Sequence, residues 1–92
     1  MTHVIGRQLL RSGTSVGANY RAACRAKSAA DFISKMGTVE EEADESLYWM
    51  ELLIEAEIAK SVKLEPLMNE ADELLAITVS SINTARKRKE RK

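Results

Sequence analysis

The chain of 92 residues provides for one domain, and its 14 basic and 14 acidic residues give a net charge of zero. Hydrophobic residues make up 45% of the chain, which excludes a disordered polymer, and the single cysteine excludes an intramolecular disulfide framework. One proline and four glycines favour long helices over short strands, and no apolar run is long enough to span a membrane.

The first predicted helix spans about residues 4–25. Its apolar side chains recur at steps of three, four or seven and so share one face: Ile5, Leu9, Val16, Tyr20 and Ala23. Gly13 and Gly17 lie inside this helix, where each costs about 1 kcal/mol relative to alanine. They mark either a weak point or a place where a neighbouring backbone comes close. The uninterrupted apolar period favours close approach, and we predict both glycines in an oligomer interface.

The second predicted helix spans residues 29–59. Ser28 and Asp31 form a Ser-x-x-acid cap directly before the apolar run. Apolar positions then alternate steps of four and three, which is a heptad pattern: Phe32, Met36, Val39, Ala43, Ser46, Met50 and Leu53. This spacing predicts a helix that packs along its whole length.

Towards its C-terminal end, over residues 47–54, the second helix is apolar on nearly every side. Such a helix needs neighbours in several directions, and two partner helices cannot easily cover it. We therefore predict a further interface, most simply between subunits, that includes Leu47, Trp49, Leu52 and Leu53. The alternative is that Tyr48 and Trp49 lie partly exposed, with their polar atoms in water.

The third predicted helix spans residues 62–86, with Ser61 as its cap. Pro66 falls in its first turns, where the missing N–H is tolerated. Links between the helices are short, so neighbouring helices should run antiparallel. The sequence thus predicts an all-α, antiparallel up-down bundle that forms a single domain over residues 1–92 and ends in a basic tail over residues 86–92.

The neutral total is divided into blocks of opposite charge. Residues 1–35 hold six basic residues and one acidic, residues 36–75 hold twelve acidic and two basic, and residues 76–92 hold six basic and one acidic. Basic ends that flank an acidic middle indicate charge-complementary packing between helices or subunits. The positive charge of the two ends also favours binding to RNA or DNA.

The charges form stripes on the first two helices. On the first, Arg7, Arg11, Arg21 and Arg25 lie within about 80° of one another. On the second, a comparable stripe flanks the heptad seam: Glu40, Asp44, Glu51 and Glu55. Either these are solvated faces, with exposed ion pairs worth about 0–1 kcal/mol each, or the stripes meet across a subunit interface.

No group of residues in the sequence has the composition and spacing of a catalytic or metal site. His3 is the only histidine, no cluster has metal-ligand spacing, and Cys24 has no histidine to activate it. We therefore predict no catalytic residue, no metal, no cofactor and no small-molecule substrate, and conclude that the protein is not an enzyme. A lone cysteine and the absence of a signal peptide fit the cytoplasm.

Much of the chain resembles a known family. The most specific part of the resemblance is the segment QLLRSGTSVGAN, residues 8–19. The match continues through Asp31-Phe32 and the Glu-rich helix that follows, through Tyr48-Trp49, and through the LEPL segment of residues 64–67. These residues resemble the four-helix-bundle proteins first noticed as products of intervening sequences in bacterial 23S ribosomal RNA genes. A related branch consists of accessory proteins of diversity-generating retroelements, which contact nucleic acid and a reverse transcriptase.

The resemblance implies an antiparallel bundle that assembles as a homopentamer, and it brings no catalytic residues and no assigned role. Members usually have a full helix before the QLLRSG segment, whereas only residues 1–7 precede it here. We therefore expect three of the four helices in this chain, with apolar surface left for other subunits to cover.

Two functions follow from these patterns. The first is an oligomeric scaffold that binds the phosphates of RNA or DNA through its basic residues. The predicted contacts are Arg7, Arg11, Arg21, Arg25, Arg86, Lys87, Arg88 and Lys89, together with the rest of the tail to residue 92. For the tail, the alternative is a solvent-exposed helix end, whose positive charges are stabilised by the negative end of the helix dipole. The second function is a protein-binding adaptor without a nucleic-acid role, which uses the apolar residues 47–54 and the acidic stripe.

Overall fold

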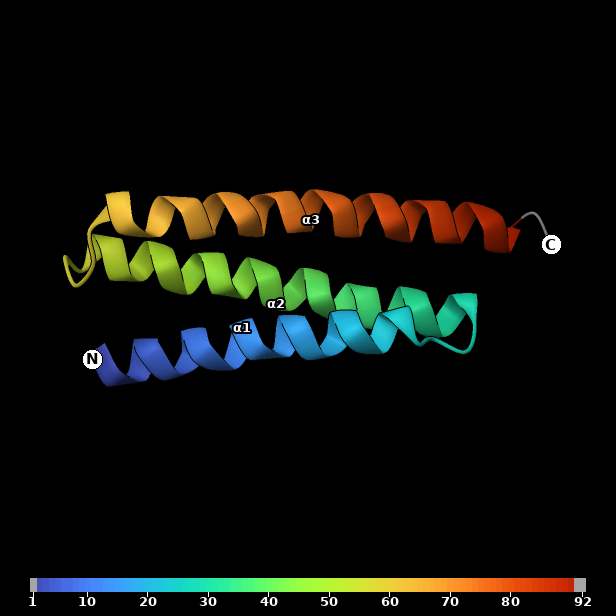
Figure 1. The fold of residues 1–92 in the computed structure, drawn as a ribbon, viewed down its shortest axis with the longest axis horizontal. Coiled ribbons are helices and arrows are strands. Elements are labelled where there is room, and N and C mark those ends of the chain that lie inside the picture. The colour runs from blue at the N-terminus through green and yellow to red at the C-terminus, as the bar shows by residue number, and fades with distance from the viewer. Residues whose placement is uncertain (1, 91–92) are drawn as a thin grey trace.

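The computed structural model describes residues 2–90, and over this range the chain forms three α-helices and no β-strand. Helix α1 comprises Thr2–Cys24, α2 comprises Ala29–Glu55, and α3 comprises Ser61–Glu90. Consecutive helices run antiparallel and form a rod of 51 × 19 × 14 Å (Figure 1). The predicted all-α, up-down bundle is therefore confirmed.

The start of α2 follows the predicted cap. Ser28 has an extended backbone, and its hydroxyl accepts a hydrogen bond from the N–H of Asp31 at 3.0 Å. The Asp31 carboxylate in turn accepts from the N–H of Lys27 at 3.2 Å. Side chains thus satisfy two backbone donors at the turn into α2, and the chain reverses direction within a few residues.

The end of α2 differs from the prediction: the helix ends at Glu55 rather than near residue 59. Glu57 adopts a left-handed backbone with φ of 59°, and its N–H donates to the carbonyl of Ile54 at 3.0 Å. The N–H of Ile58 donates to the carbonyl of Leu53, also at 3.0 Å. This pair of bonds is a Schellman motif, which usually has glycine at the left-handed position. Because glutamate occupies that position here, the sequence gives no sign of the stop.

The core lies along α2. Val39 is fully buried, and it forms a cluster with Met36 on the same helix, Ala23 on α1 and Ile82 on α3. Every predicted seam position from Met36 to Leu53 is buried, and Phe32 is half-buried. The heptad pattern therefore identified the packing face of α2 correctly.

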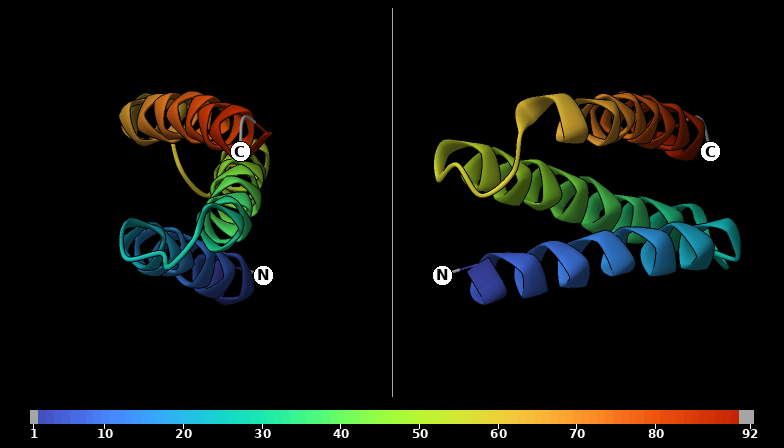
Figure 2. Two further views of the ribbon diagram at one scale, coloured as in Figure 1. Left: turned by 90° about the vertical axis from the view of Figure 1, so that its right-hand side faces the viewer. Right: turned by 60° about the vertical axis from the view of Figure 1, so that its left-hand side comes forward.

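Helix α2 lies between the other two helices. Both α1 and α3 pack against it, while no Cα atom of α1 lies within 8 Å of a Cα atom of α3 among the described residues. Viewed along the rod, the three helices form an open C with α2 at its back (Figure 2). One long side of α2, between α1 and α3, is thus left without a covering helix.

Candidate nucleic-acid interface

Basic side chains from both outer helices lie at one end of the rod. The end of α1 carries Arg21, the link to α2 carries Arg25 and Lys27, and the last two turns of α3 carry residues 86–89. Figure 1 shows the two helix ends on either side of the start of α2. All of these side chains are exposed. We call this set the basic end: Arg21, Arg25, Lys27, Arg86, Lys87, Arg88 and Lys89.

The first turns of α2 connect the two halves of the basic end. Arg21 and Arg25 border a shallow depression together with Lys35 of α2. Another depression is bordered by Arg86 and Lys89 together with Ser34. Ser34 and Lys35 are consecutive, so the two depressions flank the same turn of α2. The cationic surface therefore continues around the start of this helix, whose own dipole adds partial positive charge.

Few acids oppose this charge. Residues 21–35 and 86–90 together hold eight basic residues and two acidic ones, Asp31 and Glu90. Asp31 pairs with the Nζ of Lys35 at 3.0 Å. Lys35 first, and the N–H of Lys27 second, hold the pKa of the Asp31 carboxyl below its usual range. Within the described residues no ion pair engages the members of the basic end, so their charge faces solvent.

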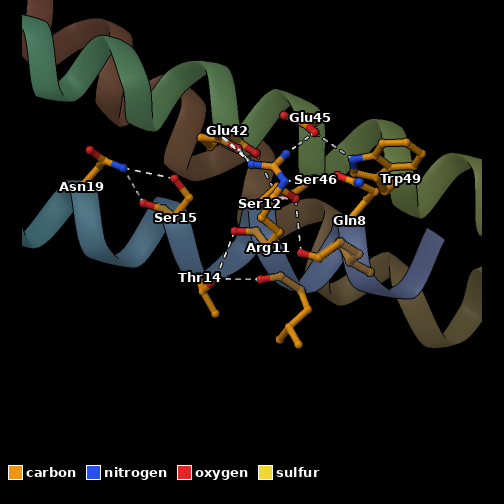
Figure 3. A network of polar contacts seen from close by, with 12 residues as sticks. Gln8, Arg11, Ser12, Thr14, Ser15, Asn19, Glu42, Glu45, Ser46 and Trp49 are labelled. Atoms are coloured by element: carbon orange, nitrogen blue, oxygen red, sulfur yellow. Dashed lines mark hydrogen bonds and ion pairs between the residues drawn. The ribbon is translucent and has the colours of Figure 1, made fainter. Parts of the chain in front are cut away.

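Arg11 belongs to a different environment (Figure 3). Its guanidinium bonds both Glu42, with Nη1 and Oε2 3.3 Å apart, and Glu45 on α2, while its Nε donates to Gln8. Trp49 donates its indole N–H to the same Glu45 carboxylate at 3.1 Å. The hydrogen bond from Arg11, followed by that from Trp49, holds the pKa of Glu45 below its usual range. The Arg11 charge is therefore balanced inside the chain.

The predicted arginine stripe thus divides into two parts. Arg7 is exposed but lies 14 residues before Arg21, which is about 21 Å along α1. Arg7 and Arg11 therefore belong to the opposite half of the rod from Arg21 and Arg25. Of the last tail residues, Arg91 and Lys92 lie outside the described residues.

Two buried serines meet at the crossing of α1 and α2, and one of them was missed as a packing residue. Ser12 is 0% exposed and Ser46 is 7% exposed, and their hydroxyl oxygens lie 2.9 Å apart (Figure 3). Ser46 was expected at the seam, but Ser12 was left out of the predicted face of α1 because it is polar. Its spacing, seven residues after Ile5 and four before Val16, was the signal that could have identified it.

The predicted interface residues fall into separate groups. Leu47 and Leu53 are already buried within the chain, whereas Trp49 and Leu52 are half-buried. The two neighbouring helices therefore cover more of residues 47–54 than expected. Tyr48 remains 53% exposed, with its ring edge-on to Trp49 at a centroid distance of 5.1 Å. Of the four predicted interface residues on α2, Leu47, Trp49, Leu52 and Leu53, only Trp49 and Leu52 keep surface for a partner.

Gly13 and Gly17 are both exposed, and the expected close approach of a neighbouring backbone does not occur within residues 2–90. A methyl group built on either glycine would have no atom of another helix within 4 Å. The interior glycines of α1 are therefore open surface in the single chain.

Residues 2–90 form neither a cluster of metal ligands nor a helix that could span a membrane. No three His, Cys, Asp or Glu side chains in this range converge as they would around a metal ion. No helix in the same range combines the length and apolar character needed to cross a membrane. The basic end is the surface on which exposed basic side chains of α1, of the link to α2 and of α3 come together.

Comparison with known proteins identifies the family. The family model of the 23S rRNA-intervening sequence protein matches residues 2–80. A crystal structure of a protein with unknown function from the S23 ribosomal protein family of Bacteroides thetaiotaomicron VPI-5482 is 44% identical, with a TM-score of 0.83 over 86% of this chain and 73% of that chain. No curated protein matches. The resemblance noted in the sequence is confirmed, and the chain belongs to the 23S rRNA-intervening sequence protein family.

Proposed function

We propose that the protein is a non-catalytic, cytoplasmic helical scaffold that binds the phosphates of RNA or DNA through its basic end and associates with further copies of itself. The observation that carries the binding proposal is the convergence of two basic segments, more than 50 residues apart in sequence, around the start of α2. Exposed cations without acidic partners release counterions when they meet a phosphate backbone. The family name is consistent with an RNA context.

The basic end offers charge but little that could read a base. Its members are arginines and lysines, and Tyr20 on α1 is the nearest exposed aromatic residue in sequence. Recognition of base identity needs side chains held in a fixed geometry against base edges, and no ion pair within the described residues fixes the arginines and lysines of the basic end. We therefore propose binding without sequence preference.

A fluorescence anisotropy titration with a labelled single-stranded RNA and a labelled DNA duplex tests this proposal. Arg21→Gln combined with Arg88→Gln should weaken binding to both probes. The slope of log K against log salt should become shallower by about 0.7–0.9 for each phosphate that the variant no longer neutralises. Arg7→Gln is the matched control, since it removes an exposed arginine at the other half of the rod and should leave the slope unchanged. Absence of binding by the wild-type protein at low salt would refute the proposal.

An adaptor function is the second candidate, and the outer face of α2 favours it. Asp44, Tyr48, Glu51 and Glu55 are exposed and follow one another at steps of four, three and four, so they share one face. An exposed tyrosine among carboxylates suits a basic protein partner. Tyr48→Ala should abolish capture of such a partner without changing nucleic-acid binding, and an unchanged set of co-purifying proteins would count against the adaptor.

A further inference from the structure

Three basic side chains surround the depression between the end of α1 and the first turns of α2, which we call the α1–α2 depression. Its charged lining is Arg21, Arg25 and Lys35, and the rest of its lining is Ala18 and Ala22. The two alanines lie one helical turn apart on α1, so the space among the cations is left open by methyl groups. The depression has a volume of about 370 Å³, within the range of about 300–1,000 Å³ that sites for small ligands occupy.

The charge around the α1–α2 depression is only partly balanced. The Nζ of Lys35 lies 3.0 Å from the carboxylate of Asp31, which holds the ammonium group in place. Arg21 and Arg25 are exposed, and within residues 2–90 neither takes part in an ion pair. Three positive charges and one negative charge therefore leave a net charge of two at this point of the surface.

The C-terminal end of α1 opposes an anion less than a bare helix end would. The N–H of Arg25 donates to the carbonyl of Ala22 at 3.1 Å, and the N–H of Ala26 donates to the carbonyl of Ala23 at 3.0 Å. Two of the last carbonyl groups are thus engaged. The remaining dipole amounts to about half a negative charge, whereas two full positive charges of arginine lie beside it.

The second depression of the basic end, between α2 and α3, has a lower net charge. It is bordered by Arg86 and Lys89 but also by Glu90, which leaves one positive charge. A phosphodiester inside a nucleic-acid strand carries one negative charge. A terminal phosphomonoester carries about 1.5–2 negative charges near pH 7, because its second pKa is about 6. The α2–α3 depression therefore matches an internal phosphate, and the α1–α2 depression matches a terminal one.

We infer that the α1–α2 depression binds the terminal phosphomonoester of an RNA or DNA strand. The guanidinium groups of Arg21 and Arg25 donate to its oxygen atoms, and Lys35 supplies a third positive charge. The two depressions flank one turn of α2, so the strand crosses about the width of a helix, 10–12 Å, to reach Arg86 and Lys89. This inference rests on the proposed nucleic-acid binding and names the part of the strand that is recognised.

Fluorescence anisotropy with internally labelled single-stranded RNA tests the inference on the full chain. One probe ends in a 5′-phosphate, a second ends in a 3′-phosphate, and a third has hydroxyl groups at both ends. The third probe is one nucleotide longer, so that all three carry the same number of phosphate groups. We expect at least one phosphate-ended probe to bind about three- to tenfold more tightly than the hydroxyl-ended probe, a modest preference because exposed ion pairs each contribute little.

Two variants with matched controls locate the site of this preference. Arg25→Gln removes one cation of the α1–α2 depression and should reduce the preference below about twofold. Arg86→Gln removes an arginine of the other depression, so it should weaken binding of all three probes and retain the preference. Ala18→Leu fills the α1–α2 depression without any change of charge, and Ala76→Leu is its control, since both alanines are exposed and helical. Circular dichroism verifies that each variant is folded.

Loss of the preference in either folded variant of the α1–α2 depression, with both controls retaining it, supports the inference. Equal binding of the three probes by the wild type would overturn the terminal-phosphate site while binding at the basic end stood. A preference that both depression variants retain, or that a control also loses, would overturn it in the same way. Absence of binding to any probe at low salt would overturn both the site and the proposed function.

Discussion

The buried hydroxyl pair at the crossing of α1 and α2 allows a quantitative test of how the two helices are joined. Ser12 and Ser46 are 34 residues apart in sequence, and their hydroxyl oxygens lie 2.9 Å apart. Each also has an acceptor in its own helix, since Ser12 lies 3.2 Å from the carbonyl of Leu9 and Ser46 lies 2.9 Å from that of Glu42. Removal of one hydroxyl therefore leaves the other satisfied.

This arrangement determines how large the coupling free energy between Ser12 and Ser46 should be. An orphaned buried hydroxyl would cost about 1–3 kcal/mol, whereas a net hydrogen bond between satisfied groups contributes about 0.5–1.5 kcal/mol. We expect the second case, so a double-mutant cycle of Ser12→Ala and Ser46→Ala should give a coupling energy of about 1 kcal/mol. The cycle is needed because each serine-to-alanine change also raises helix propensity, which offsets part of the loss in the single variants.

Urea unfolding followed by circular dichroism provides the assay, and every variant is measured at the same protein concentration because the proposed self-association would add to the apparent stability. Ser15→Ala with Ser46→Ala is the control cycle, since Ser15 bonds Asn19 on its own helix and should couple to Ser46 by less than about 0.5 kcal/mol. A Ser12–Ser46 coupling near zero, or one above about 2 kcal/mol, would refute the account of the pair.

Three further predictions concern the fold. Glu57→Gly should raise the free energy of unfolding by about 0.5–1 kcal/mol, because glycine adopts the left-handed backbone without strain; a loss of stability in thermal melts would contradict this. Val39→Ala should cost about 2 kcal/mol, because Val39 is fully buried, whereas Val79→Ala, at a site 40% exposed, should cost much less in the same urea series. Lys35 lowers the pKa of Asp31, so their ion pair contributes at neutral pH and is lost as the pH falls through that lowered pKa. Asp31→Asn should therefore lower the free energy of unfolding at neutral pH and reduce the further loss of stability that acidification below about pH 4 causes. If the free energy of unfolding has the same pH dependence in the wild type and the variant, the ion pair does not contribute.

Local patterns predicted most of the fold. The heptad spacing identified the buried face of α2, and the Ser28–Asp31 cap identified its start, because both signals depend on residues close together in sequence. The end of α2 escaped prediction because Glu57 occupies a position where glycine is the usual signal. The charged site was harder, since a helical stripe shows which arginines share a face but not what lies opposite them. Arg11 meets Glu42 and Glu45 across helices, and only the packing of α1 on α2 reveals that its charge is balanced.

The central place of α2 also has a consequence for how the chain moves and folds. Since α1 and α3 each pack on α2 and not on each other, the described chain consists of two helical hairpins that share one helix. Every interhelical contact joins neighbours in sequence, a topology of low contact order that favours rapid folding. The buried cluster around Val39 takes side chains from all three helices, so hydrogen exchange should be slowest in α2, which both outer helices cover.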